Sequence, residues 1–158
     1  MGSTETGTAE SGPMARALAE ARAAGARGEV PVGAVVTGPD GAVLAACGNA
    51  VEAGADASAH AELLAMRAAA AGRGSRYLDD CTLYVTLEPC PMCAQAASLF
   101  RIRRVVFGAY DPKGGGVEHG PRIFDAASCH HRPEVVGGVR EREAAALLRD
   151  FFAGLRGV

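Results

Sequence analysis

Four residues of the kinds that bind metal and move protons stand at two points of the sequence. His60 and Glu62 belong to an H-A-E triplet, and Cys90 and Cys93 belong to the stretch P-C-P-M-C. Residues i and i+3 share a helix face, so the two cysteines could hold one ion if a helix begins near Pro91. The positive end of such a helix favours thiolates, the form that binds metal. With His60 they make three ligands, typical of a catalytic zinc with one position open to water, and Glu62 is placed to move protons rather than to bind the ion.

A Cys-x-x-Cys pair can also be a redox pair or half of a structural zinc site. Nothing around Cys90 and Cys93 is typical of the thioredoxin arrangement, which disfavours a redox pair. A structural site would need a fourth ligand, for which the candidates are Cys47, Cys81, Cys129, His130 and His131. The combination of the H-A-E triplet with a cysteine pair 30 residues later favours the catalytic interpretation.

Length and composition predict one domain in a reducing compartment. The chain has 158 residues, 49% of them hydrophobic, and no apolar run long enough to span a membrane. No secretory signal is visible at its start. Five cysteines, two of them assigned to metal, favour a reducing cytosol, so we expect a cytoplasmic protein without a membrane partner.

The charge is unevenly distributed along the chain. Through Ala94 there are 6 basic and 11 acidic residues, a balance of −5, whereas from Gln95 onward there are 10 basic and 7 acidic residues, a balance of +3. Arg101, Arg103 and Arg104 form the densest basic cluster. Such a cluster either contacts phosphates or forms a solvated helix end, and charge alone does not separate the two.

Hydrophobic periodicity and turn residues predict alternating helices and strands after a mobile tail at residues 1–12. The expected helices begin at Pro13, at Ser58 as the capping residue, at Cys90 and at Arg140, and end near residues 25–28, 71, 100 and 155. The expected strands span residues 32–37, 42–47, 82–87, 104–109 and 134–139. Residues 13–158 are therefore predicted to form a single α/β domain, with a central mixed sheet and helices on both faces.

The zinc-ligand pattern resembles that of the cytidine deaminase superfamily, whose signature is H-x-E followed by P-C-x-x-C. Within the superfamily, the chain is most similar to the bacterial tRNA adenosine deaminase branch. The similar stretches are residues 29–35 (EVPVGAV), 83–90 (LYVTLEPC), 104–109 (RVVFGA), 111–115 (DPKGG) and 145–152 (AALLRDFF). The resemblance implies a three-layer α/β/α fold with a mixed, mostly five-stranded sheet. It also implies a homodimer that converts the wobble adenosine of a tRNA anticodon loop to inosine.

The resemblance also implies roles for individual residues. His60, Cys90 and Cys93 would hold one zinc ion per chain, Glu62 would carry protons, and the backbone N–H of Cys90 would orient the attacking oxygen. Substrate contacts would come from Asn49, Ala61, Asp111 and Lys113. From the residues alone, Asn49 could instead be a turn residue after Gly48, and Asp111 and Lys113 could be ordinary loop residues.

Several positions depart from the usual pattern of this branch, and they concern substrate contacts rather than the zinc ligands. They are Gln95, Ala50, Ala57 and the segment 117–120 (VEHG). Two other functions stay open at this point. One is deamination of a free nucleobase, nucleoside or nucleotide of the guanine or cytosine type, and the other is a non-catalytic, zinc-stabilised RNA-binding module. His119, His130 and His131 are interpreted as loop or RNA-side residues rather than zinc ligands.

Overall fold

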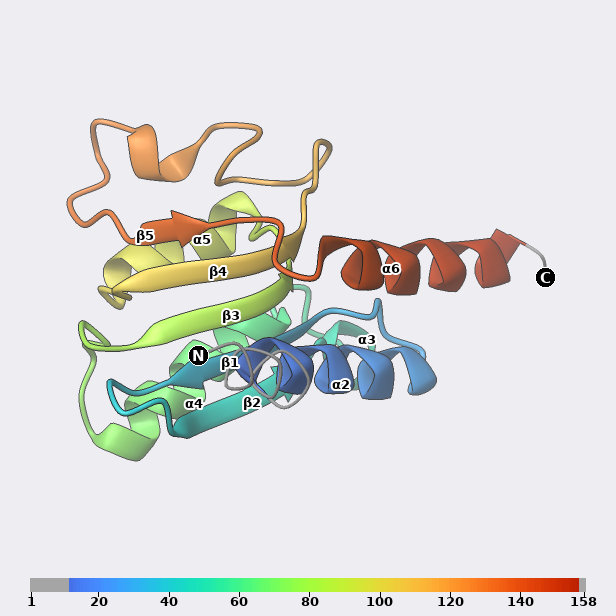
Figure 1. Ribbon diagram of the computed structural model, residues 1–158, viewed down its shortest axis with the longest axis horizontal. Helices are drawn as coiled ribbons and strands as arrows, with labels where there is room; N and C mark the ends of the chain where they lie inside the picture. The colour runs from blue at the N-terminus through green and yellow to red at the C-terminus, as the bar shows by residue number, and fades with distance from the viewer. Residues whose placement is uncertain (1–11, 157–158) are drawn as a thin grey trace, which may run out of the picture.

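A five-stranded sheet in the order β2-β1-β3-β4-β5 forms the centre of the computed structural model, which describes residues 12–156 (Figure 1). The strands are β1 (Gly33–Thr37), β2 (Val43–Gly48), β3 (Thr82–Leu87), β4 (Arg104–Ala109) and β5 (Glu134–Val136). β1 runs antiparallel to β2 and β3, whereas β3, β4 and β5 are parallel. The predicted mixed sheet is thus confirmed. Of the predicted tail, residues 1–11 lie outside the described residues.

Helices cover both faces of this sheet, which confirms the predicted three layers (Figure 1). Helices α2 (Pro13–Ala26) and α6 (Glu141–Arg156) pack on one face, and α4 (Ala61–Arg73) and α5 (Pro91–Leu99) lie on the other. A single turn, α3 (Val51–Gly54), and a 3-10 turn, η1 (Ile123–Asp125), lie in the connections. Within residues 12–156 no helix combines the length and the apolar character needed to cross a membrane.

Alternation along the buried strands divides the interior into two cores. In β1, Val35 packs with Leu18 of α2, whereas Val36 belongs to the core under α4 and α5. In β4, Val106 faces the α2 and α6 side, and Phe107 faces the opposite core and is fully buried. Because successive strand residues point to opposite faces, one sheet supports both helical layers.

The backbone of α2 lies so close to β1 that only glycine fits at position 33. A Cβ on Gly33 would collide with the Ala17 carbonyl oxygen and would lie 2.6 Å from the Ala21 nitrogen. This contact fixes the distance between α2 and the sheet. It thereby also fixes the position of the Glu29–Val32 segment, which connects α2 to β1.

The end of β5 differs from the prediction, and α6 begins at Glu141, one residue after the predicted start at Arg140. β5 ends at Val136 rather than at residue 139, because Gly137 packs against the Phe107 ring and Gly138 adopts a left-handed φ of 82°. α6 is amphipathic as predicted, but among its described residues only Ala144 is buried. The end of α6 extends beyond the sheet (Figure 1). Phe151 and Phe152 of this helix line a cavity of the same chain.

Candidate active site

The three expected ligands meet where β3 ends and where α4 and α5 begin. Nδ1 of His60 lies 3.5 Å from the sulfur of Cys90 and 3.5 Å from that of Cys93, and all three atoms lie within 4.8 Å of one another. Tetrahedral zinc with ordinary Zn–N and Zn–S bonds places such atoms about 3.6 Å apart. The donor atoms and their spacing therefore fit one zinc ion, and within residues 12–156 this is the one group of its kind.

The local structure also supports a thiolate at Cys90. Cys90 occupies the N-cap position of α5, and Pro91 occupies the first helical position, where its missing N–H is not needed. The Cys93 thiol hydrogen-bonds to Cys90 and lowers the pKa of Cys90 to about 4; burial opposes this effect and His60 adds to it. The Cys93 thiol, as the donor of that bond, has a raised pKa. His60 also has a raised pKa, chiefly because it hydrogen-bonds to Cys90.

Glu62 lies in the first turn of α4 and is only 4% exposed to solvent. Burial raises the pKa of Glu62 to about 7; its own backbone N–H opposes this rise, whereas the charge of Cys90 adds to it. A carboxyl group with a pKa close to neutrality can both accept and release a proton, as general acid–base catalysis requires.

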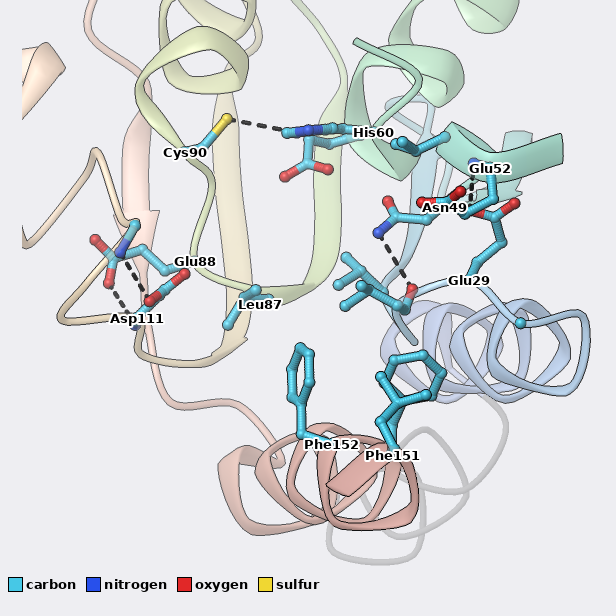
Figure 2. Close-up of a pocket in the computed structure, with 17 residues that line it drawn as sticks. Glu29, Asn49, Glu52, His60, Leu87, Glu88, Cys90, Asp111, Phe151 and Phe152 are labelled. Atoms are coloured by element: carbon cyan, nitrogen blue, oxygen red, sulfur yellow. Dashed lines mark hydrogen bonds between the residues drawn. The ribbon is translucent and has the colours of Figure 1, made fainter. Parts of the chain in front are cut away.

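These groups form the floor of a cavity of about 600 Å³. Figure 2 shows His60 and Cys90 at one end of the cavity, with the Phe151 and Phe152 rings rising toward it from α6. The cavity lies outside the carboxyl ends of β3 and β4, the usual place for a ligand in an α/β sheet. Cys93 is buried beneath it.

Asn49 joins the Val30 loop to the start of α4. Its Oδ1 accepts a hydrogen bond from the Ala61 N–H at 2.8 Å, and its Nδ2 donates to the Val30 carbonyl at 3.2 Å. His60 is the N-cap residue, but its side chain makes no capping bond and faces the thiols instead. Asn49 therefore supplies the missing cap from 12 residues upstream.

The prediction that Ser58 caps this helix is wrong. α4 begins at Ala61, and the Ser58 hydroxyl instead donates to Asp56 at 2.7 Å, while the Ser58 N–H donates to the same oxygen. Asp and Ser side chains commonly form such local turns in competition with a cap. His60 thus stands just before the helix rather than within its first turn.

The other residues implied in substrate binding differ in position. Asp111 lines the cavity, and Lys113 lines a smaller neighbouring one that Asp111 and Phe152 share. The Ala61 side chain is fully buried. His119 and His131 serve loop structure: His119 hydrogen-bonds to Glu88, and His131 to the Ile102 carbonyl.

Two buried carboxylates beside the cavity were missed from the sequence. Glu29 is 1% exposed and accepts the N–H groups of Glu52 and Ala53, which lowers its pKa. Glu88 is 2% exposed and accepts several N–H groups of the loop that follows β4. The available signal was an acidic residue in an otherwise apolar segment, E-V-P-V for Glu29 and V-T-L-E-P for Glu88.

Comparison with known proteins agrees with this fold and site. A family model described as the cytidine and deoxycytidylate deaminase zinc-binding region matches residues 8–109. The chain therefore belongs to the cytidine and deoxycytidylate deaminase family of zinc-binding enzymes.

Individual relatives narrow the resemblance. The chain is 52% identical over 139 residues to the tRNA-specific adenosine deaminase of Agrobacterium fabrum, covering 88% of this chain and 91% of the relative. A solved structure from studies of A-to-I editing by tRNA:A34 deaminases at the wobble position of transfer RNA superposes with a TM-score of 0.84 at 51% identity. The superposition covers 86% of this chain and 98% of the chain in that structure. A guanine deaminase from Nitrosomonas europaea is more distant, with a TM-score of 0.72 at 28% identity, covering 89% of this chain and 83% of its own.

Proposed function

We propose that this protein deaminates adenosine to inosine at the wobble position of a tRNA anticodon loop. The observation that carries the proposal is the buried Glu62 beside the His60–Cys90–Cys93 group on the floor of an open cavity. The adenosine substrate is inferred from the similarity to tRNA-specific adenosine deaminases.

We assign His60, Cys90 and Cys93 as ligands of one zinc ion per chain. Held by these three residues, a zinc ion would lower the pKa of water towards neutrality and so would supply a nucleophile. Glu62 accepts a proton from the water and transfers it to the purine ring nitrogen N1. The oxygen then bonds to C6, and Glu62 takes the remaining proton of this new hydroxyl group and delivers it to the amino group. The C6–N bond breaks as ammonia leaves, which gives the C6 carbonyl of inosine. We also assign the backbone N–H of Cys90, the N-cap residue of α5, to orienting the attacking oxygen.

We assign the walls of the cavity to the substrate. A nucleotide extruded from the anticodon loop can enter a cavity of about 600 Å³. The Asn49 oxygen accepts the Ala61 N–H, and one of its two amide protons is donated to the Val30 carbonyl. The second amide proton can therefore bond to a base. Asp111 and Lys113 adjoin the smaller cavity, where they can contact the flanking nucleotides, and Ala61 contributes a small buried side chain beside His60.

We also propose that residues 13–158 act as one domain, in a cytoplasmic homodimer. One sheet supports both cores, which favours a single domain. Met92 and Leu99 are 39% and 68% exposed on α5, and their spacing of seven residues places them on one face, suited to a second copy. A cytoplasmic location follows from a tRNA substrate. Sedimentation equilibrium tests the homodimer, and a monomer at all concentrations would refute it.

The decisive experiment supplies zinc-loaded protein with an anticodon stem-loop that carries adenosine at the wobble position, beside free guanine and cytosine. We expect inosine in the stem-loop, and no inosine with Glu62→Gln although that variant still binds one zinc per chain. Glu118→Gln, which alters an exposed carboxylate, is the matched control and should remain active.

Two results would point elsewhere. Deamination of guanine alone would favour the free-base activity of the Nitrosomonas europaea neighbour, with which this chain shares its fold. Unchanged RNA-dependent function in Glu62→Gln would instead favour a non-catalytic RNA-binding module.

A further inference from the structure

Glu88 is a buried carboxylate whose partners lie almost entirely in one loop. Its side chain is 0% exposed, and within the described residues its ion-pair partner is a histidine rather than a lysine or arginine. Burying a carboxylate is costly unless its oxygens accept strong hydrogen bonds. The bonds that Glu88 accepts must therefore be essential to the local structure.

Four backbone N–H groups of the loop donate to Glu88, and a ring nitrogen of His119 is its fifth partner. Oε1 accepts the Asp111 N–H at 3.0 Å and bonds Nδ1 of His119 at 2.8 Å. Oε2 accepts the N–H groups of Val117, Glu118 and His119 at 3.2, 2.8 and 3.0 Å. Each oxygen of Glu88 therefore bonds at least two of these groups, which suits an ionised carboxylate because both of its oxygens accept. The loop is thus folded around a carboxylate anion.

The glycines of the loop allow this close approach. A Cβ on Gly115 would lie 2.5 Å from Oε2 of Glu88, and one on Gly116 would lie 2.5 Å from the Pro91 nitrogen. The Gly116 N–H also donates to the Pro89 carbonyl at 2.8 Å. The loop is therefore seated directly on the Glu88–Pro91 turn, which carries Cys90.

The same loop forms one wall of the active-site cavity. Asp111 lines the cavity close to Glu88 (Figure 2). Its Oδ1 accepts the N–H groups of Lys113 and Gly114 at 3.2 and 2.9 Å. Glu88 holds the Asp111 backbone, so a change at Glu88 would move Asp111 and Lys113 together. It would leave His60, Cys90 and Cys93 in place, because no bond to Glu88 involves their side chains.

We propose that Glu88 is a positioning residue for the substrate: it clamps the Asp111–His119 loop onto the cysteine-bearing turn and so fixes the distance of Asp111 and Lys113 from the zinc site. The clamp depends on negative charge, because a carboxylate accepts at both oxygens whereas an amide accepts at one. This inference deepens the proposed function, on which its kinetic consequence rests, but its structural consequence does not depend on the substrate.

The first test measures amide hydrogen exchange in zinc-loaded protein without RNA. Glu88→Gln keeps the volume of the side chain but turns an NH₂ group toward two or three N–H donors. We expect the loop amides that donate to Glu88 to exchange about tenfold faster or more, as expected for losing a hydrogen bond to a charged group, with one zinc per chain retained. Glu118→Gln, in the same loop but exposed, should exchange as the wild type does. Wild-type exchange in Glu88→Gln would overturn the proposal.

The second test separates binding from chemistry. We expect Glu88→Gln to raise KM for the anticodon stem-loop about tenfold while kcat changes less than about threefold, because uniform binding is lost rather than transition-state stabilisation. A fall in kcat with unchanged KM would overturn the positioning role. If Glu88→Gln fails to fold, His119→Ala removes a single bond and should show the same direction of change in both tests; no change in either would overturn the proposal. A wild type that forms no inosine would refute the proposed substrate, whereas the exchange result would still decide the clamp.

Discussion

Replacing Asn49 with alanine tests whether this residue builds the site or only contacts the substrate. The 9% exposed side chain caps α4 through Ala61 and ties that helix to the Val30 carbonyl. His60 cannot take over the cap, because its ring faces the two thiols. Asn49→Ala therefore leaves the buried Ala61 N–H without its partner at the helix start, immediately after a zinc ligand.

The size of the effect follows from these two bonds. Each hydrogen bond contributes about 1 kcal/mol, and a buried N–H left unsatisfied costs about 1–3 kcal/mol. Together they predict a loss of about 2–4 kcal/mol in the free energy of unfolding. For a chain of this size, a loss of 1 kcal/mol lowers Tm by about 2–4 °C, so Tm should fall by about 4–16 °C. Asn49→Asp keeps an acceptor for the Ala61 N–H but loses the donor to the Val30 carbonyl. The Tm of this variant should therefore lie between those of Asn49→Ala and the wild type.

Calorimetry of zinc-loaded protein in the absence of RNA provides the assay. The matched control is Glu52→Ala, an exposed side chain of the neighbouring turn, which should stay within about 0.5 kcal/mol of wild type. If Asn49→Ala is as stable as this control, the capping argument is refuted and Asn49 acts on substrate alone.

Three further predictions concern the zinc site, an ion pair and the packing of α2. Chelation should release one zinc per chain, and scanning calorimetry should show stability restored by added zinc, by about 2.7 kcal/mol at a free concentration of 100 times Kd; equal Tm values with and without zinc would contradict this. Asp80, whose pKa is lowered to about 2 chiefly by its hydrogen bond with Arg73, is partly exposed, so Asp80→Asn should cost only about 0.5–1 kcal/mol in urea unfolding at pH 7. Because the folded pKa is lowered, this difference is present above pH 4 and should vanish toward pH 2; a constant difference would exclude the pair as its cause. Gly33→Ala should prevent folding because its Cβ would collide with the α2 backbone. The control Gly72→Ala lies in open space on α4, so it should fold, and its free energy of unfolding in chemical denaturation should rise by up to about 1 kcal/mol. Similar yields of folded protein from the two variants would refute the close contact.

The sequence predicted those elements whose signals are local. β3 and β4 have the predicted bounds of residues 82–87 and 104–109, because both are apolar runs between turn residues. α2 begins at Pro13 as expected, and α5 begins at Pro91, one residue after the expected start at Cys90, since proline is suited to the first helical turn. The H-A-E and P-C-x-x-C patterns correctly indicated side chains that come together, although the pairing of two chain segments 30 residues apart follows only from the fold.

Features that depend on distant contacts were not predicted. The cap of α4 comes from Asn49 on the far side of α3, so the nearby Ser58 was the wrong choice. β5 stops early because of the Phe107 ring, which arrives from another strand. Glu29 and Glu88 carry no sequence mark of their partners, because those partners are backbone N–H groups present in every loop.

This contrast bears on how substrate choice is built into the fold. The proposed zinc ligands and Glu62 lie at helix starts that short sequence patterns indicate. The walls of the cavity are instead held by Glu29 on the Asn49 side and by Glu88 on the Asp111 side (Figure 2). A change in loop sequence that preserves the N–H donors can keep each wall in place while altering the side chains that face the substrate. In this chain, substrate choice can therefore depend on the side chains of the loops that Glu29 and Glu88 hold.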